Sequence, residues 1–98
     1  MTTPLSLTPG RRPDGAPVLT VVGEIDMSNT DAFATAIETT DGPLVIDLTG
    51  VEYLDSAGLS VLFHHSERLE LIATPLLEPV LSISGLADLT TVHHVDTP

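Results

Sequence analysis

Cysteine, tryptophan and lysine are all absent from this sequence of 98 residues. Without cysteine the chain can form no disulfide, has no thiolate for a metal ion and carries no thiol redox switch. Its aromatic residues are two phenylalanines and one tyrosine. We therefore expect a core of leucine, valine, isoleucine and alanine, and no aromatic platform on which nucleic-acid bases could stack.

Long apolar runs are also missing. No stretch of the sequence approaches the roughly 20 apolar residues of a membrane-spanning helix. The first residues, Met1-Thr2-Thr3-Pro4-Leu5, lack the basic and apolar regions of a secretory signal. We therefore expect a cytoplasmic protein with no membrane partner.

Positive charge is scarce. Three arginines and fourteen acidic residues give a formal net charge of −11 at pH 7. Nucleic acids and anionic membranes repel such a surface, so neither is an expected partner. Two interpretations of the charge stay open, because an acidic surface can steer a basic protein partner or can simply keep a small domain soluble.

Length and hydrophobicity predict one folded domain over residues 1–98, with loose ends at 1–4 and 96–98. The hydrophobic fraction of 42% is too high for a disordered chain. The apolar pattern predicts the element order β-β-α-β-α-β-α-β. The predicted strands are 5–7, 18–23, 44–48, 68–73 and 91–95. The predicted helices begin at the capping residues 28–31, at 55–56 and at 74–75, and the predicted turns include 9–15 and 49–54.

Alternation of strands and helices indicates an α/β fold, in which the crossovers are right-handed and the sheet is mostly parallel. We expect about five strands, with about three helices packed on them. Sites in such sheets gather where strands end and helices begin. The loops that follow Gly23 and Leu48 are both of this kind, and they could bring Asp26 and Ser56 close together.

Asp55 and Ser56 stand at the start of the second predicted helix. From the residues alone, simple capping explains the pair, since Asp55 can accept hydrogen bonds from the first helical N–H groups. A helix N-terminus also favours negative charge, so an added phosphate on Ser56 would be tolerated there. Capping and phosphorylation are compatible, and both interpretations stay open at this point.

Four segments resemble the STAS domain family, in particular the bacterial anti-sigma factor antagonists, and they occur in the family's order. The resemblance covers roughly Leu5 to Val95, and its most specific part is the Asp-Ser-x-Gly-Leu motif at 55–59. The segments are Val22-Gly23-Glu24-Ile25-Asp26, Val45-Ile46-Asp47-Leu48-Thr49-Gly50-Val51, Leu54-Asp55-Ser56-Ala57-Gly58-Leu59 and Ser84-Gly85-Leu86-Ala87-Asp88-Leu89.

This resemblance implies a partner switch. The unmodified antagonist would bind an anti-sigma factor that is also a GHKL-type serine kinase, and binding would free a sigma factor. The kinase would phosphorylate Ser56, the partner would be released, and a separate serine phosphatase would reset the switch. ATP and Mg²⁺ would belong to the kinase, so no cofactor is expected in this chain. The implied partner-binding residues are Asp26, Asp55, Ser56, Ala57, Gly58 and Leu59.

One departure from the family pattern concerns the second helix, which we expect to be a turn or more shorter because only residues 63–67 separate Leu62 from Arg68. Two other functions stay open. The domain could be a STAS scaffold of another signalling assembly that is never phosphorylated. It could also be a serine-dependent hydrolase, but His64 would lie about 12 Å from Ser56 along a helix, beyond hydrogen-bond reach.

Metal binding and catalysis are not expected. The histidines form two adjacent pairs, His64-His65 and His93-His94. Neighbouring residues on a helix or strand point in divergent directions, so neither pair is a chelating set. We therefore predict no catalytic and no metal-ligating residues.

Overall fold

A five-stranded mixed sheet carries the fold in the computed structural model, which describes residues 4–95. The strands are β1 Ser6–Arg11, β2 Pro17–Ile25, β3 Leu44–Leu54, β4 Leu69–Ala73 and β5 Thr91–His94, and they are ordered β1-β2-β3-β4-β5 across the sheet. The helices are α1 Thr30–Glu38, α2 Ser56–His64 and α3 Glu78–Ile83, with the short 3₁₀ helices η1 Ser66–Arg68 and η2 Leu86–Asp88. Only β1 and β2 run antiparallel, so the predicted α/β class, element order and mostly parallel sheet are confirmed.

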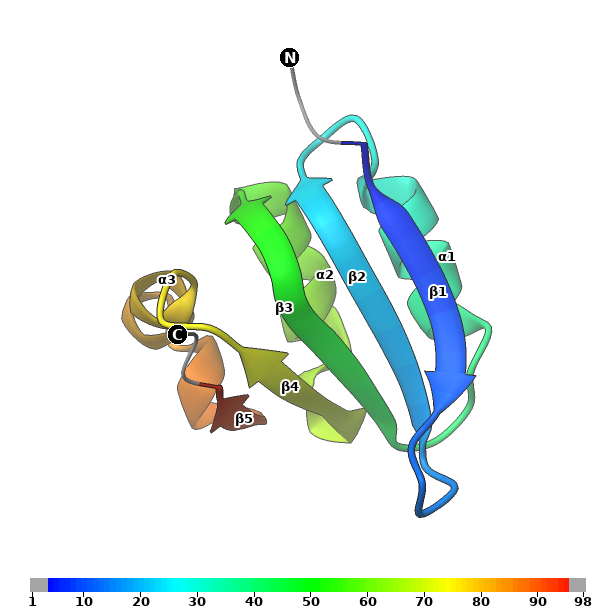
Figure 1. Cartoon of the computed structure of the whole chain (residues 1–98). Helices are drawn as coiled ribbons and strands as arrows, with labels where there is room; N and C mark the ends of the chain where they lie inside the picture. Colours follow the sequence, from blue (N-terminus) through cyan, green and yellow to red (C-terminus); the bar gives the residue numbers. More distant parts are fainter. Residues whose placement is uncertain (1–3, 96–98) are drawn as a thin grey trace.

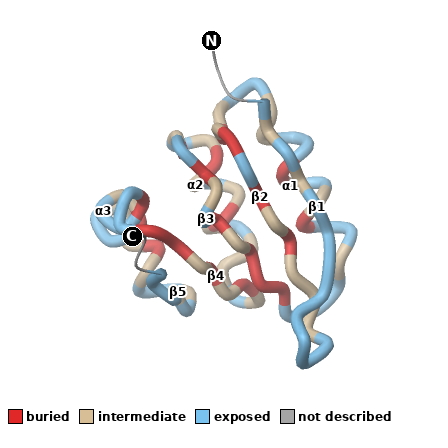
Figure 2. The backbone as a smooth tube through the Cα atoms, viewed as in Figure 1, coloured by how far each residue is buried: buried red, intermediate tan, exposed pale blue. Residues whose placement is uncertain are grey.

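The helices α1 and α2 lie side by side against one face of the sheet, while α3 lies beyond the carboxyl end of β4 (Figure 1). Buried residues run along β2, β3 and β4 (Figure 2). From the helices, Phe33, Ile37 and Leu62 reach the core and are fully buried. None of the helices within residues 4–95 is both long and apolar enough to cross a membrane. The predicted loose ends, 1–4 and 96–98, lie outside the described residues except for Pro4.

The first hairpin is longer than the sequence predicts. Residues 9–11 were predicted in a turn, but they extend β1 as far as the pair Arg11↔Pro17. Because β1 is an edge strand, Pro9 can be accommodated although it has no N–H to donate. The turn itself is confined to residues 12–16, where Arg12 N donates to the Ala16 carbonyl and Gly15 adopts a φ of +90°.

The prediction that the third strand ends at residue 48 is also wrong, because β3 continues to Leu54. Its register against β2 shifts twice, and at each shift β3 contains one residue more than β2. Such bulges break the alternation of buried and exposed residues. The buried residues Leu48, Val51 and Leu54 are consequently three apart, a spacing that does not look like a strand in the sequence.

The third helix starts later than predicted. Residues 74–77 form a turn closed by the Leu77 N–H on the Thr74 carbonyl, and α3 begins at Glu78. Pro79 takes the first-turn position that was predicted for Pro75, where the missing N–H costs nothing. Gly85 ends the helix as expected, with a left-handed φ of +88°.

Candidate functional site

The carboxyl ends of β2 and β3 lie next to each other, and both α1 and α2 begin there (Figure 1). Ile25 and Leu54 are register partners, and the Asp55 N–H donates to the Ile25 carbonyl at 3.2 Å. A shallow hollow at this point is lined by Asp26, Met27, Ser28 and Asp55. The two loops therefore meet, since Asp26 and Asp55 line the same hollow, and Ser56 directly follows Asp55 in the sequence.

Ser56 is the exposed first residue of α2. Asp55 is the N-cap residue, and its Oδ1 accepts hydrogen bonds from the N–H groups of Ala57 at 3.0 Å and Gly58 at 3.1 Å. The predicted capping role of Asp55 is thus confirmed. The Ser56 side chain is left at the surface, while its carbonyl accepts a hydrogen bond from the Ser60 hydroxyl.

Asp26 is the first residue of the loop between β2 and α1. Its Oδ1 accepts hydrogen bonds from the Ser28 hydroxyl at 2.5 Å and from the Ser28 N–H at 2.9 Å. These two bonds, the hydroxyl bond first, hold the pKa of Asp26 below its usual value. An aspartate with its usual pKa is already ionised near neutral pH, so the hollow has a negative charge on its Asp26 side.

Asn29 stabilises the same loop in an unexpected way. It is the N-cap residue of α1, but its side chain makes no capping hydrogen bond. Instead the Asn29 side chain accepts from the Asp26 N–H at 3.0 Å and donates to the Glu24 carbonyl at 2.8 Å. The N-cap of α1 thus falls within the predicted capping residues 28–31, but the Asn29 side chain ties the loop to the end of β2 and does not cap the helix.

The predicted partner-binding residues differ in exposure. Asp26, Asp55, Ala57 and Leu59 are half-buried, whereas Gly58 is buried beneath the start of α2. A Cβ atom at Gly58 would lie 2.6 Å from Leu54 Cδ1 and 2.7 Å from Ile25 Cγ2. The glycine therefore lets α2 approach the sheet closely, and its contact with a partner stays a prediction.

Two exposed apolar side chains at this end were missed by the sequence analysis. Met27 is 81% exposed in the β2–α1 loop, and Tyr53 is 51% exposed opposite Glu24 near the end of β3. Large exposed apolar groups beside polar ones are typical of protein-binding surfaces. The available signal was the position of Met27, which directly follows Asp26 in the loop where a parallel strand ends.

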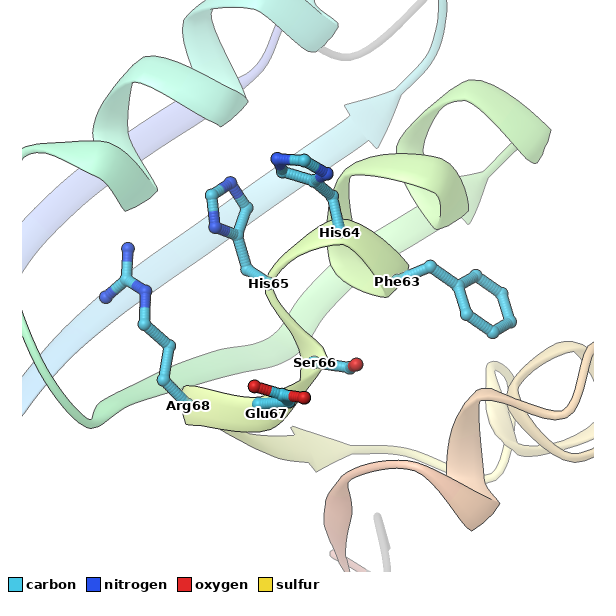
Figure 3. Close-up of a pocket in the computed structure, with 6 residues that line it drawn as sticks. All are labelled: Phe63, His64, His65, Ser66, Glu67 and Arg68. Carbon is cyan, nitrogen blue, oxygen red and sulfur yellow. The ribbon is translucent and has the colours of Figure 1, made fainter.

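A second hollow, of about 260 Å³, lies at the other end of α2 and is lined by residues 63–68 (Figure 3). Phe63 points away from the two histidines, whereas Arg68 extends toward the end of α1 (Figure 3). Arg68 donates to the carbonyls of Ile37, Thr40 and Gly42 at 2.7–2.9 Å. On the lining of this hollow, Arg68 therefore satisfies carbonyl groups at and beyond the end of α1.

His65 lies in the same region and is mostly buried. Its side chain is 13% exposed, and its Nε2 atom lies 3.7 Å from Glu38 Oε2. Burial lowers the pKa of His65, His64 and Arg68 lower it further, and Glu38 opposes them. Ser56 and His64 are the first and last residues of α2, so the serine has no histidine base on its own helix. Within residues 4–95 no group of three or more acidic or histidine side chains could hold a metal ion.

A family model and a curated relative both match this chain. The family model described as "Mlab, STAS domain" matches residues 10–91. The anti-sigma-F factor antagonist RsfB of Mycobacterium tuberculosis is 43% identical over 60 residues, which are 57% of this chain and 49% of that protein. The chain thus matches about half the length of this curated relative.

Solved structures show the same fold. The crystal structure of an anti-sigma factor antagonist from Mycobacterium paratuberculosis superposes with a TM-score of 0.84 at 30% identity, covering 95% of this chain and 90% of the other. A STAS-domain antisigma-factor antagonist from Rhodobacter sphaeroides superposes with a TM-score of 0.51 at 18% identity, covering 70% of this chain and 84% of the other. The second likeness concerns the fold alone.

Proposed function

Because this chain belongs to the STAS domain family, we propose that it is an anti-sigma factor antagonist, a regulatory protein rather than an enzyme. The relatives that are described as antagonists support this function. Its partner would be an anti-sigma factor, and binding would free a sigma factor for transcription. A regulator of this kind acts where transcription occurs, so we propose that it works in the cytoplasm.

The observation that carries the proposal is the position of Ser56. Its side chain is exposed at the first residue of α2, beside the hollow that Asp26 and Asp55 line. Exposed Met27 supplies apolar area next to this charge. We propose that the partner docks here, on Asp26, Asp55, Ser56, Ala57, Gly58 and Leu59, with Met27 added from the structure.

We further propose that phosphorylation of Ser56 releases the partner. The anti-sigma factor would act as a GHKL-type serine kinase on its own antagonist, and a separate serine phosphatase would reverse the reaction. A phosphate adds about −1.5 to −2 charges at neutral pH, together with bulk that must be desolvated at an interface. Since like charges brought together at an interface cost several kcal/mol, we expect affinity to fall by about 100-fold or more.

The first test is the intact mass of the protein after incubation with candidate anti-sigma kinases and Mg-ATP. Wild type should gain one phosphate, Ser56→Ala none, and Ser60→Ala, which changes an exposed serine one turn further along α2, should behave like wild type. Calorimetric titration of the partner with unmodified and with Ser56-phosphorylated wild type then measures how much affinity the phosphate removes.

Other outcomes would contradict the proposal in distinct ways. Tight partner binding without any phosphate gain, unchanged in Ser56→Ala, would indicate a scaffold that is not switched at this residue. Covalent labelling of Ser56 by a serine-reactive phosphonate would indicate a hydrolase.

A further inference from the structure

The N-terminus of α2 already has an anionic occupant. The carboxylate of Asp55 accepts hydrogen bonds from the N–H groups of Ala57 and Gly58. These are the donors that a phosphate on Ser56 would otherwise use, because free N–H groups at a helix start bind phosphate and the helix dipole favours its charge. A phosphate on Ser56 and the side chain of Asp55 therefore compete for the same two donors.

The backbone of Asp55 is fixed on both sides. Its N–H donates to the Ile25 carbonyl at 3.2 Å, and its carbonyl accepts the Leu59 N–H at 3.0 Å. Asp55 also lines the hollow with Asp26, so a carboxylate displaced from the helix would lie on the same surface as the Asp26 carboxylate. The Asp26 carboxylate is itself held in place by Ser28, so the displaced Asp55 would meet a second negative charge.

We propose that Asp55 is a positioning residue that keeps a phosphate on Ser56 off the N-terminus of α2 and directs it outward. This inference rests on the proposed phosphorylation of Ser56. The added group then gains no hydrogen bond from Ala57 or Gly58, and it remains accessible to a partner or a phosphatase. The switch works by surface charge, because the phosphate does not become part of the helix cap.

The test installs phosphoserine at position 56 during translation, so that no kinase and no partner is needed. Three proteins are compared: wild type, Asp55→Asn, which keeps a capping oxygen but no charge, and Asp55→Gly, which frees both donors while glycine remains acceptable at the cap. ³¹P NMR follows the titration of the phosphate, and ¹H–¹⁵N spectra follow the N–H groups of Ala57 and Gly58.

In wild type the two N–H resonances should not move downfield as the phosphate ionises, whereas in Asp55→Gly both should move with it. In Asp55→Asn the N–H groups should stay capped, but the phosphate should titrate about half a pH unit lower. This shift corresponds to the repulsion between two unit charges about 6 Å apart in water. Phosphoserine at Ser82, exposed on α3, is the matched control and should titrate alike with and without Asp55.

Two results would overturn the inference. The first is downfield movement of the Ala57 and Gly58 N–H groups with phosphate ionisation in wild type, since the phosphate would then have displaced Asp55. The second is an identical phosphate titration in wild type and Asp55→Asn. Neither of these two results depends on a kinase. An absence of phosphorylation by any anti-sigma factor would therefore count against the proposed function, whereas the N–H shifts and the phosphate titration alone decide this inference.

Discussion

Gly58→Ala is the substitution that tests most directly how the site is positioned. The added methyl group would lie 2.6 Å from Leu54 Cδ1 and 2.7 Å from Ile25 Cγ2. Ordinary carbon contacts are about 3.5–4.0 Å, so both neighbours would have to retreat by about 1 Å. Leu54 is 6% exposed and Ile25 is fully buried, on two different strands, and both belong to the core, where side chains are closely packed.

The expected cost follows from two opposing terms. Overpacking a buried site costs about 1–3 kcal/mol, and a clash with two buried neighbours belongs in the upper part of that range. Alanine is favoured over glycine inside a helix by about 1 kcal/mol, which offsets part of the cost. We therefore expect Gly58→Ala to lower the free energy of unfolding by about 1–2 kcal/mol. For a chain of this size each kcal/mol lowers the Tm by about 4–8 °C.

Chemical denaturation followed by circular dichroism measures this change. The matched control is Gly50→Ala, whose methyl group would lie 2.9 Å from Val22 Cγ2. Val22 is 42% exposed and can turn toward solvent, so the control should lose less stability than Gly58→Ala. A Gly58→Ala protein as stable as wild type would refute the argument that α2 needs a glycine to approach the sheet.

Three further sets of substitutions test the contacts around α2. Asp55→Ala removes the cap and should lower the free energy of unfolding by about 1 kcal/mol in urea titrations, whereas Asp55→Asn should change it little. Arg68→Ala removes three hydrogen bonds to carbonyl groups and should cost about 2 kcal/mol in the same assay, and full recovery by Arg68→Lys would contradict the role of the planar guanidinium. Folding lowers the pKa of His65, so as the pH decreases below about 6.5 the unfolded chain binds a proton at this residue more readily than the folded chain does. The free energy of unfolding therefore decreases as the pH decreases. The Tm of wild type should therefore fall more steeply than that of His65→Gln between about pH 7 and pH 5, and parallel curves would contradict this assignment.

The order of the elements could be predicted from the sequence because their boundaries have local causes. Gly85 ends α3 through a left-handed backbone that glycine adopts without strain, and Asp55 starts α2 through hydrogen bonds to residues two and three positions away. The end of β3 depends on its partner instead. Its two bulges arise from pairing with β2, whose paired residues lie 27–29 positions earlier in the sequence, and no local pattern reveals them.

In the candidate site, too, some features could be predicted from the local sequence and others depend on contacts made only in the folded chain. Asp26, Asp55 and Ser56 could be selected from their motif and from the rule that sites form where parallel strands end. The role of Asn29 could not, because its side chain is equally suited to capping α1 and to bonding the loop. The choice is made by the Asp26 N–H and the Glu24 carbonyl, which the folded loop places on either side of the Asn29 amide.

For the proposed release of the partner, the distribution of arginine favours a mechanism by charge over one by refolding. Arg68 is bonded to carbonyl groups near the end of α1, and Arg11 and Arg12 lie at the β1–β2 turn, at the opposite end of β2 from Asp26. The sequence has no lysine, so among residues 4–95 a phosphate on Ser56 has no arginine or lysine at this end of the sheet with which to form a new contact. The effect of the phosphate must then fall on the partner, through repulsion and desolvation.

Because salt screens exposed charges over about 10 Å at 0.1 M, the difference in partner affinity between the unmodified and the phosphorylated protein should narrow as salt is added. A difference that is independent of salt would indicate that bulk, not charge, causes the release.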